Sequence, residues 1–288
     1  MKYGLFMPNF GPFGDVDALV EMATAAEAHG WDGFFLWDHI VLDGEQAPMA
    51  DPWVALTAIT AATSRLRVGT MVTPVARRRP WKLARETASL DTFSKGRLVL
   101  GVGLGVPADT EFGTFGEELD DRRRANMLDE GLEVLDGLWT GESYSFEGEH
   151  YSVREARFDR PFQRPRVPIW CAGWWPNKRP FRRAARWDGV IPEMVGGDTP
   201  EPRHVREIRA YIDEHRGSDA PFDIAIDGYT DEPDPARTEE YEAAGTTWWL
   251  ERFAPDRLFD FDAAIGRIKA GTHGRVVAGG NQNQKGSR

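Results

Sequence analysis

The chain has 288 residues, of which 41% are hydrophobic and 28% are charged, a composition that suits one globular domain with a large core. Its formal net charge of -11 and pI near 5.1 disfavour general binding to nucleic acid or to anionic membrane surfaces, because like charges repel.

The cysteine content and the length of the apolar runs indicate the cellular compartment in which the protein is expected. Cys171 is the single cysteine and cannot form an internal disulfide, and the first strand-like run begins at Lys2 with no signal-peptide pattern before it. No run approaches the roughly 20 apolar residues that cross a bilayer. The sequence therefore predicts a cytoplasmic protein.

Short apolar runs rich in β-branched and aromatic residues alternate with longer segments of helical period along the chain, which is typical of βαβ units around a parallel sheet. Eight such pairs predict a closed (β/α)8 TIM barrel. The predicted strands are Tyr3–Met7, Gly33–Trp37, Leu66–Val72, Leu98–Val102, Val167–Ala172, Gly189–Pro192, Phe222–Asp227 and Thr246–Leu250.

The intervening segments carry helix signals. Asp51 precedes Pro52 as an N-cap before a first-turn proline, and Gly30 follows the first helical segment where a left-handed residue is expected. An apolar stripe of helical spacing is formed by Leu19, Met22, Ala23 and Ala26.

Two segments depart from the alternation. Glu142–Val153 alternates on either side of Glu147–Gly148 and predicts a small β-hairpin inserted after helix four, lying over one end of the barrel. The segment 271–288 lacks apolar period and is predicted to be a disordered tail. Residues 1–270 then form the single barrel domain.

The ends of the strands are the candidate functional positions, because the active site of a (β/α)8 barrel forms where strands end and βα loops begin. Asp38 and His39 directly follow the second strand. An imidazole exchanges protons near neutral pH, and a neighbouring carboxylate orients a ring or accepts a hydrogen bond. The alternative is that Asp38 caps a turn and His39 bonds only to the backbone.

Glycines and basic residues mark two further strand ends. Gly101–Gly105 fits a dinucleotide-binding loop poorly and suits the close approach of a flat ring, or an ordinary turn. The loop Cys171–Arg179 precedes a helix and suits a phosphate, with positive charge from its basic residues. Arg77–Arg79 could meet an anionic cofactor tail or be solvated. Cys171 itself is expected to be a small buried residue.

Four tryptophans lie at the fifth and eighth strands, and they could wall a pocket for an aromatic or apolar substrate. Packing in the core is the alternative, particularly for alternate members of each pair. The four are Trp174, Trp175, Trp248 and Trp249.

Taken together, these segments resemble the bacterial luciferase-like superfamily of flavin- and deazaflavin-dependent oxidoreductases, from Tyr3 to about Lys269. The resemblance rests on KYGLFMPNFG, AEAHGWDGFFLWDHI, SRLRVGTMVTPVARRRPWKLARETASLDTFSKGRLVLGVGLG, ESYSFEGEHYSV and RPRVPIWCAGWWPNKRPFRRAARWDGVIPE. It implies FMN or coenzyme F420 at the barrel mouth.

The resemblance also implies residue roles. Asp38 is similar to the acidic residue that touches the deazaflavin ring, and His39 to the adjacent catalytic histidine. Thr70–Met71 matches the point where the family holds a non-prolyl cis peptide behind the ring. Further cofactor contacts are implied at Gly103, Ala172, Gly173 and Trp174. Sugar-phosphate dehydrogenases of this family carry a glutamate where this chain has Val106, which argues against that substrate.

Two mechanisms follow from the resemblance. In the favoured one, His39 exchanges a proton with the substrate while hydride passes to or from F420. In the other, reduced FMN from a partner reductase reacts with O2 to oxygenate the substrate. A metal-dependent barrel is an alternative, with ligands from Asp38, His39, Glu193, Asp227 and Glu251. A flavoprotein that only stores its cofactor is another. The family suggests a homodimer.

Overall fold

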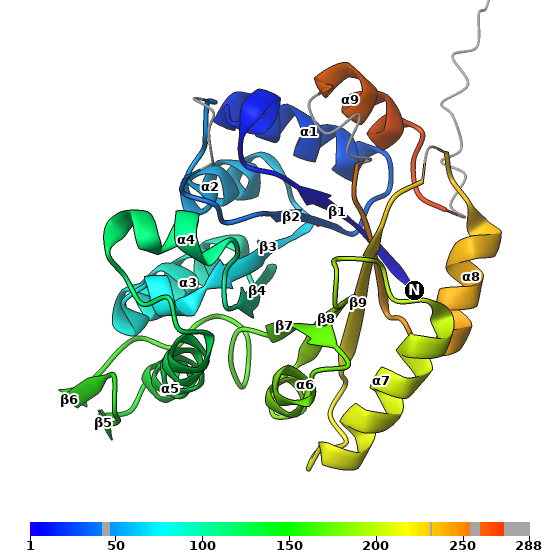
Figure 1. The fold of residues 1–288 in the computed structure, drawn as a ribbon. Helices are drawn as coiled ribbons and strands as arrows, with labels where there is room; N and C mark the ends of the chain where they lie inside the picture. Colours follow the sequence, from blue (N-terminus) through cyan, green and yellow to red (C-terminus); the bar gives the residue numbers. More distant parts are fainter. Residues whose placement is uncertain (42–46, 231, 254–259, 274–288) are drawn as a thin grey trace, which may run out of the picture.

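The computed structural model describes residues 1–41, 47–230, 232–253 and 260–273. In these residues eight parallel strands close into a barrel in the order β1-β10-β9-β8-β7-β4-β3-β2, and helices form a ring around it (Figure 1). This arrangement confirms the predicted (β/α)8 barrel. Its strands are β1 (Lys2–Met7), β2 (Gly33–Leu36), β3 (Arg67–Pro74), β4 (Leu98–Gly103), β7 (Ile169–Trp175), β8 (Gly189–Met194), β9 (Asp223–Gly228) and β10 (Trp248–Glu251).

The helices alternate with these strands along the chain. They are α1 (Val16–Ala28), α2 (Pro52–Ala62), α3 (Pro80–Ser94), α4 (Ala108–Glu111), α5 (Asp121–Trp139), α6 (Lys178–Ala184), α7 (Pro202–His215), α8 (Pro235–Ala244) and α9 (Phe261–Lys269). Three short 3-10 turns accompany them in the described chain: η1 (Gly11–Phe13), η2 (Val75–Arg77) and η3 (Gly113–Phe115). The short helix α4 is an addition that the apolar periodicity did not predict.

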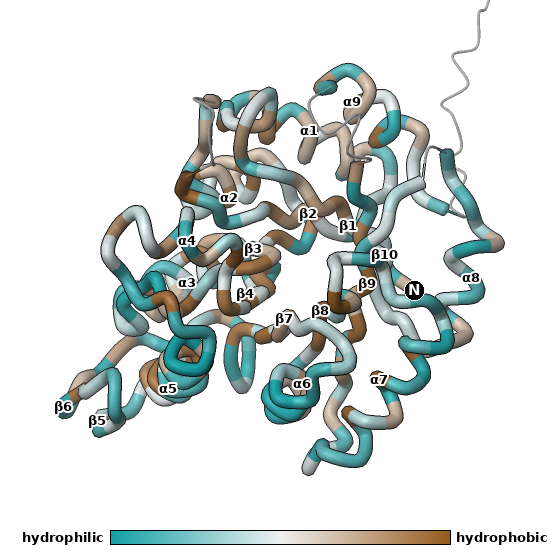
Figure 2. Tube along the Cα trace, viewed as in Figure 1, coloured by the Kyte–Doolittle hydropathy of each residue, from teal (hydrophilic) through white to brown (hydrophobic). Residues whose placement is uncertain are grey.

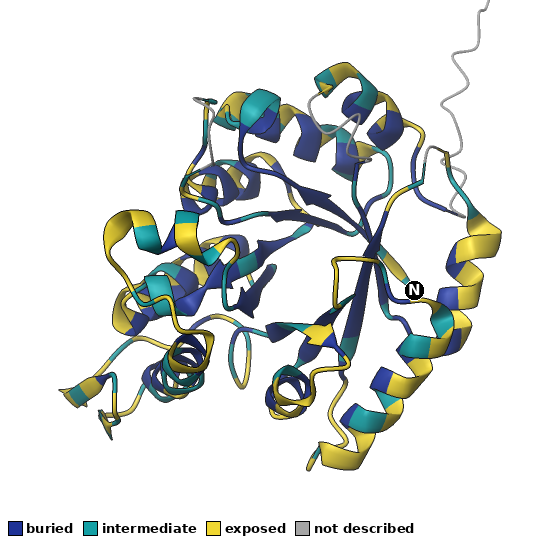
Figure 3. Cartoon of the chain, in the orientation of Figure 1, coloured by how far each residue is buried: buried dark blue, intermediate teal, exposed yellow. Residues whose placement is uncertain are grey.

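Hydrophobic burial on both faces explains why the strands form. Figure 2 shows apolar residues concentrated on the strands, and Figure 3 shows the strands buried while the outer helix faces are exposed. Ring contacts join Phe35, Trp170 and Trp248, which come from β2, β7 and β10, so these side chains meet inside the barrel. Near-continuous hydrophobicity is the expected pattern for such doubly buried strands.

The helix signals in the sequence act as expected. Asp51 accepts hydrogen bonds from the backbone N–H groups of Trp53 and Val54, so α2 begins at Pro52. Gly30 follows α1 with φ of 85°, in the left-handed region that favours glycine. The stripe Leu19, Met22, Ala23 and Ala26 is fully buried.

The predicted hairpin is present as β5 (Tyr144–Glu147) and β6 (Ser152–Ala156). It lies beside α5 at the outer edge of the helical ring (Figure 1), and not over an end of the barrel. The carboxylate of Glu130 on α5 explains this position, because it accepts backbone N–H bonds from Glu149, His150 and Tyr151 at 2.9, 2.9 and 3.1 Å.

The folded chain continues past the predicted boundary at residue 270. Thr272 and His273 are buried, and His273 Nε2 lies 2.9 Å from the carboxylate of Glu251. The rest of the predicted tail, residues 274–288, lies outside the described residues. In the described part of the chain no helix has both the length and the apolar character needed to span a membrane.

Candidate active site

The inner barrel residues show which side chains reach the C-terminal mouth. Phe35, Ile191, Ala225 and Leu250 belong to the inner cluster. Side chains alternate across a strand, so residues two positions further on also face inward. This places Trp37, Glu193, Asp227 and Arg252 at the mouth, and His39 directly above the end of β2.

Asp38 is enclosed by hydrogen-bond donors. Its carboxylate accepts from Thr73 Oγ1 at 2.7 Å, from Arg77 at 2.9 Å and from Arg78 at 2.9 Å. The Asp38 side chain has no exposed surface. The ion pairs order the two arginines behind the mouth, and a ring contact by Asp38 stays a prediction.

His39 is held at both its backbone and its ring. The side chain of Asn9, which is fully buried, donates to the His39 carbonyl at 2.9 Å. The ring atom Nδ1 lies 2.8 Å from Glu111 Oε1, and Glu111 is itself paired with Arg77. The carboxylate can only accept, so Nδ1 carries the proton and Nε2 is left to act as an acceptor. About a quarter of the His39 side chain is exposed (24%).

Glu111 is the functional candidate that sequence reasoning missed. It lies on α4, in the loop after β4, and is 1% exposed. A lone glutamate in a polar loop gives no local signal of burial. Its position matters only because the loop returns to His39, which is 72 residues away in the sequence.

Gly103 and Ala172, two of the residues predicted to contact the cofactor, form one arc with Val72 across β3, β4 and β7. A Cβ built on Gly103 would lie 2.6 Å from Val72 Cγ2 and 3.5 Å from Ala172 Cβ, so the three residues are in close contact. Thr70 is fully buried, and its hydroxyl lies 2.8 Å from that of Thr73. Val72 and Ala172 are half-buried and pack against the inner cluster, whereas Gly103 is buried.

The position of the cis peptide corrects one expectation. The non-prolyl cis bond joins Met71 and Val72, one residue beyond the predicted Thr70–Met71. The register between β3 and β4 also shifts between Thr70 and Thr73. Thr70 and Met71 are both buried, whereas Val72 is half-buried and lies on the surface of the arc.

The loop predicted to bind phosphate runs from β7 into α6. Gly173 packs closely on the α6 segment, since an added Cβ would lie 2.4 Å from Pro180 Cβ. Arg179 and Arg183 both bind Asp129, whose single negative charge compensates one of their two positive charges. Lys178 Nζ lies over the Trp175 ring, 3.4 Å from its centroid. Phosphate binding by Ala172–Trp174 stays a prediction.

The four tryptophans divide into three core residues and one mouth residue. Trp175, Trp248 and Trp249 are buried, whereas Trp174 is 44% exposed and donates its indole N–H to Glu193 Oε2 at 2.9 Å. Of these four tryptophans, Trp174 alone therefore lies at the mouth, where the sequence had suggested a wall of several. Cys171 is buried, as expected, and burial raises its thiol pKa to about 12.

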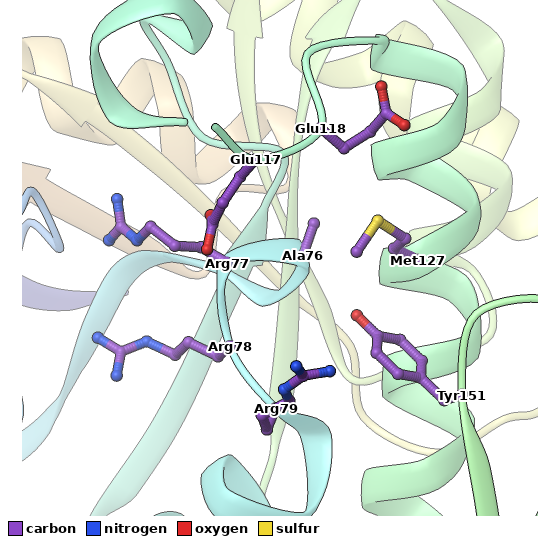
Figure 4. Close-up of a pocket in the computed structure, with 8 residues that line it drawn as sticks. All are labelled: Ala76, Arg77, Arg78, Arg79, Glu117, Glu118, Met127 and Tyr151. Atoms are coloured by element: carbon purple, nitrogen blue, oxygen red, sulfur yellow. The ribbon is translucent and has the colours of Figure 1, made fainter. Parts of the chain in front are cut away.

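Arg77–Arg79 line an outer pocket of about 270 Å³ between η2 and α5. Figure 4 shows the guanidinium groups of Arg77 and Arg78 directed away from Tyr151, and that of Arg79 directed towards it. Arg77 and Arg78 are held by Asp38, so neither is free to meet an anionic tail. Burial raises the pKa of Tyr151 to about 12. The lining residues are Ala76, Arg77, Arg78, Arg79, Glu117, Glu118, Met127 and Tyr151.

The side chains considered as ligands of a metal-dependent barrel do not converge on one point. Glu251 follows the inward Leu250 and accepts bonds from Trp249 and His273 on the outer side of the strand. Asp38 is occupied by the two arginines. Across the described ranges no three His, Cys, Asp or Glu side chains are grouped so that they could hold a metal ion.

The fold and this mouth define a (β/α)8 barrel whose strand ends hold an imidazole, carboxylates and a flat surface beside them. The family model described as luciferase-like monooxygenase matches residues 1–265. The chain belongs to this family.

Curated relatives give a more specific comparison. The chain is 38% identical over 202 residues to a protein from Microbacterium testaceum named F420-dependent glucose-6-phosphate dehydrogenase, covering 67% of this chain and 55% of the relative. It is 38% identical over 171 residues to a protein of the same name from Nakamurella multipartita, covering 57% and 48%. The chain thus spans about half the length of these relatives.

Solved structures share the fold. An F420-dependent secondary alcohol dehydrogenase has a TM-score of 0.74 at 20% identity, covering 93% of this chain and 98% of that one. The oxygenating constituent of 3,6-diketocamphane monooxygenase from Pseudomonas putida, solved with FMN, has a TM-score of 0.71 at 15% identity, covering 94% and 96%.

Proposed function

We propose that the chain is an oxidoreductase that uses coenzyme F420 in preference to FMN, with His39 exchanging a proton with the substrate. The observation that carries this proposal is the His39–Glu111 pair, which fixes the imidazole with its free nitrogen available at the mouth. The names of the curated relatives, which are F420-dependent dehydrogenases, support the choice of cofactor.

The residues of the arc fit a flat cofactor ring. Val72 and Ala172 are half-buried, and Gly103 between them has no side chain to stand in the way. Ala172, Gly173 and the backbone of Trp174 are the proposed contacts for the cofactor's phosphate, whereas the Trp174 side chain is bonded to Glu193. Bound F420 would supply a hydride acceptor or donor.

The other steps belong to the protein. Glu111 keeps the proton on Nδ1 of His39, so Nε2 accepts the hydroxyl proton of an alcohol, or returns one to a carbonyl in the reverse direction. Arg77 pairs with both Glu111 and Asp38, which holds the Glu111 carboxylate in place. Asn9 fixes the His39 backbone. The protein thus controls the proton while orienting the substrate.

Adding F420 or FMN to the purified protein tests the cofactor. We expect quenching of F420 fluorescence at micromolar protein and weaker binding of FMN. Tight FMN binding with no response to F420 would instead favour the O2-dependent monooxygenase, with its partner reductase. A His39→Ala variant that turns over substrate as fast as the wild type would contradict the proton-transfer role and favour a storage protein.

A further inference from the structure

We propose that the inward residues at the ends of β7–β10 form the substrate-recognition face, and that this face takes a non-phosphorylated, hydroxyl-bearing substrate. The face consists of Trp174, Glu193, Asp227 and Arg252, and we call it the acidic wall. The inference rests on the proposed function, because it names the substrate class for that same mouth.

The barrel order places the acidic wall across the mouth from His39. Going round the closed barrel, β8 is four strands from β2 in either direction. Trp174 and Glu193 are register partners on β7 and β8, and the Trp174 indole donates to Glu193. A substrate lying between the two sides would meet His39 on one side and the acidic wall on the other.

Asp227 is the residue of the wall whose buried carboxylate lacks a hydrogen-bond donor among the residues that the structure describes. It is 1% exposed, and neither carboxylate oxygen accepts a hydrogen bond from another described residue. Arg252 lies 3.2 Å from Oδ2 as an ion pair without hydrogen-bond geometry. A buried carboxylate with open acceptor sites is unfavourable until a donor reaches it. A substrate hydroxyl would supply that donor.

The electrostatics of the wall agree with this geometry. Burial raises the pKa of Asp227 to about 6, with Arg252 opposing the shift and Glu193 adding to it. A hydroxyl that donates to the carboxylate would favour its ionised form. In the unliganded wall, burial thus makes the ionised form of Asp227 less favourable than it is in water.

The charge of the wall disfavours a phosphate ester. Among its four residues two are acidic, and the single cation, Arg252, is paired with Asp227. Across the mouth, Arg77 and Arg78 are held by Asp38. A phosphate dianion would therefore meet the two carboxylates of the wall, while Arg252, Arg77 and Arg78 are already paired with carboxylates. Like-charge contacts are strongly unfavourable. The proposed substrate class therefore differs from the glucose 6-phosphate in the names of the curated relatives.

Matched pairs of alcohols and their phosphate esters test the proposal. The F420-loaded protein, labelled with carbon-13 at aspartate carboxyls, is titrated with glycerol, glucose and 2-propanol, and with glycerol 3-phosphate and glucose 6-phosphate. The Asp227 signal is assigned with Asp227→Asn. We expect at least one alcohol to shift this signal and lower its titration midpoint, with each ester binding about tenfold more weakly than its parent alcohol.

Charge-neutralising variants give a second readout. Glu193→Gln combined with Asp227→Asn should reduce the discrimination against the esters by about tenfold, whereas Glu207→Gln on the exposed face of α7 should leave it unchanged. Tighter binding of an ester by the wild type would overturn the proposal, and so would an Asp227 signal that no alcohol shifts. F420 quenching in the same samples reports separately on the proposed function.

Discussion

At the scale of single residues, the contact between Glu111 and His39 decides what the imidazole can do. Glu111 is buried and ionic, and its two oxygens are directed at different partners, His39 and Arg77. A hydrogen bond to a charged group contributes roughly 1.5–3 kcal/mol. Such a bond is strong enough to select one of the two imidazole tautomers.

Replacing Glu111 by alanine should therefore allow His39 to adopt both imidazole tautomers. We expect nitrogen-15 NMR to show a single Nδ1–H form of His39 in the wild type and a mixture in Glu111→Ala, with turnover lowered roughly tenfold to a hundredfold. Glu117→Ala, an exposed residue further along the same loop, is the matched control. An unchanged tautomer in Glu111→Ala would show that the ring is oriented by something else.

The pKa of Asp227 makes a residue-scale prediction about stability. The folded-state pKa of about 6 is above the unfolded value of about 3.9, so the folded chain binds this proton more tightly. The free energy of unfolding should therefore fall as pH rises from about 4 to about 6, by roughly 2–3 kcal/mol in total. The loss persists at higher pH.

Asp227→Asn removes this loss. Without cofactor, the variant should be more stable than the wild type by about 2 kcal/mol near pH 7.5 and equal to it near pH 4, as measured by urea unfolding. Asp213→Asn, on the exposed face of α7, should show no such pH-dependent gain. Equal stability of Asp227→Asn and wild type at both pH values would mean that the carboxylate finds a donor in the free protein.

At the scale of elements, the hairpin shows how one side chain can position two strands. The β5–β6 hairpin is polar and largely exposed on the outside of the ring, and two strands alone are marginally stable in water. Glu130 on α5 satisfies three successive backbone N–H groups at its turn. Its attachment to α5 therefore depends strongly on this carboxylate.

Glu130→Ala should detach the turn of the hairpin without unfolding the barrel. We expect hydrogen exchange at Glu149, His150 and Tyr151 to accelerate at least tenfold, because each loses a charge-assisted bond. Amides of β4 should keep their protection. Glu133→Ala, which removes an exposed ion pair from the same helix, serves as the control. Unchanged exchange at the three amides would contradict the anchoring role.

The strands were predictable from the sequence because they are apolar and buried, whereas the paths of the loops were not predictable. Near-continuous apolar runs identify doubly buried strands, so all eight were located. Their ends were less certain: β3, β7 and β8 extend to Pro74, Trp175 and Met194, beyond the apolar run, because the backbone pairing continues into the mouth. Asp38 and His39 stood at a strand end, whereas Glu111 joined them through a loop whose path no local pattern encodes.

At the scale of the whole molecule, the barrel must close between its first and last strands. β1 pairs with β10, and the buried carboxylate of Glu251 at the end of β10 organises the segment that follows. It accepts bonds from Trp249 Nε1 at 2.8 Å, Thr230 N at 2.6 Å and His273 Nε2 at 2.9 Å, with Arg267 at 3.3 Å. The polar, aperiodic sequence from Gly271 onward concealed this contact.

His273 links three parts of the chain, because its Nδ1 accepts the backbone N–H of Asp234 at 2.7 Å while Nε2 binds Glu251. His273→Ala should lower the free energy of unfolding by roughly 2–4 kcal/mol, since a buried carboxylate and a backbone N–H both lose a partner. His215→Ala, at the exposed end of α7, should cost less than about 0.5 kcal/mol. If urea unfolding gave His273→Ala the same free energy of unfolding as the wild type, the contacts of His273 would not stabilise the barrel. A loss of about 2–4 kcal/mol in the free energy of unfolding, with faster hydrogen exchange in β1 and β10, would instead show that His273 stabilises the pairing of these two strands.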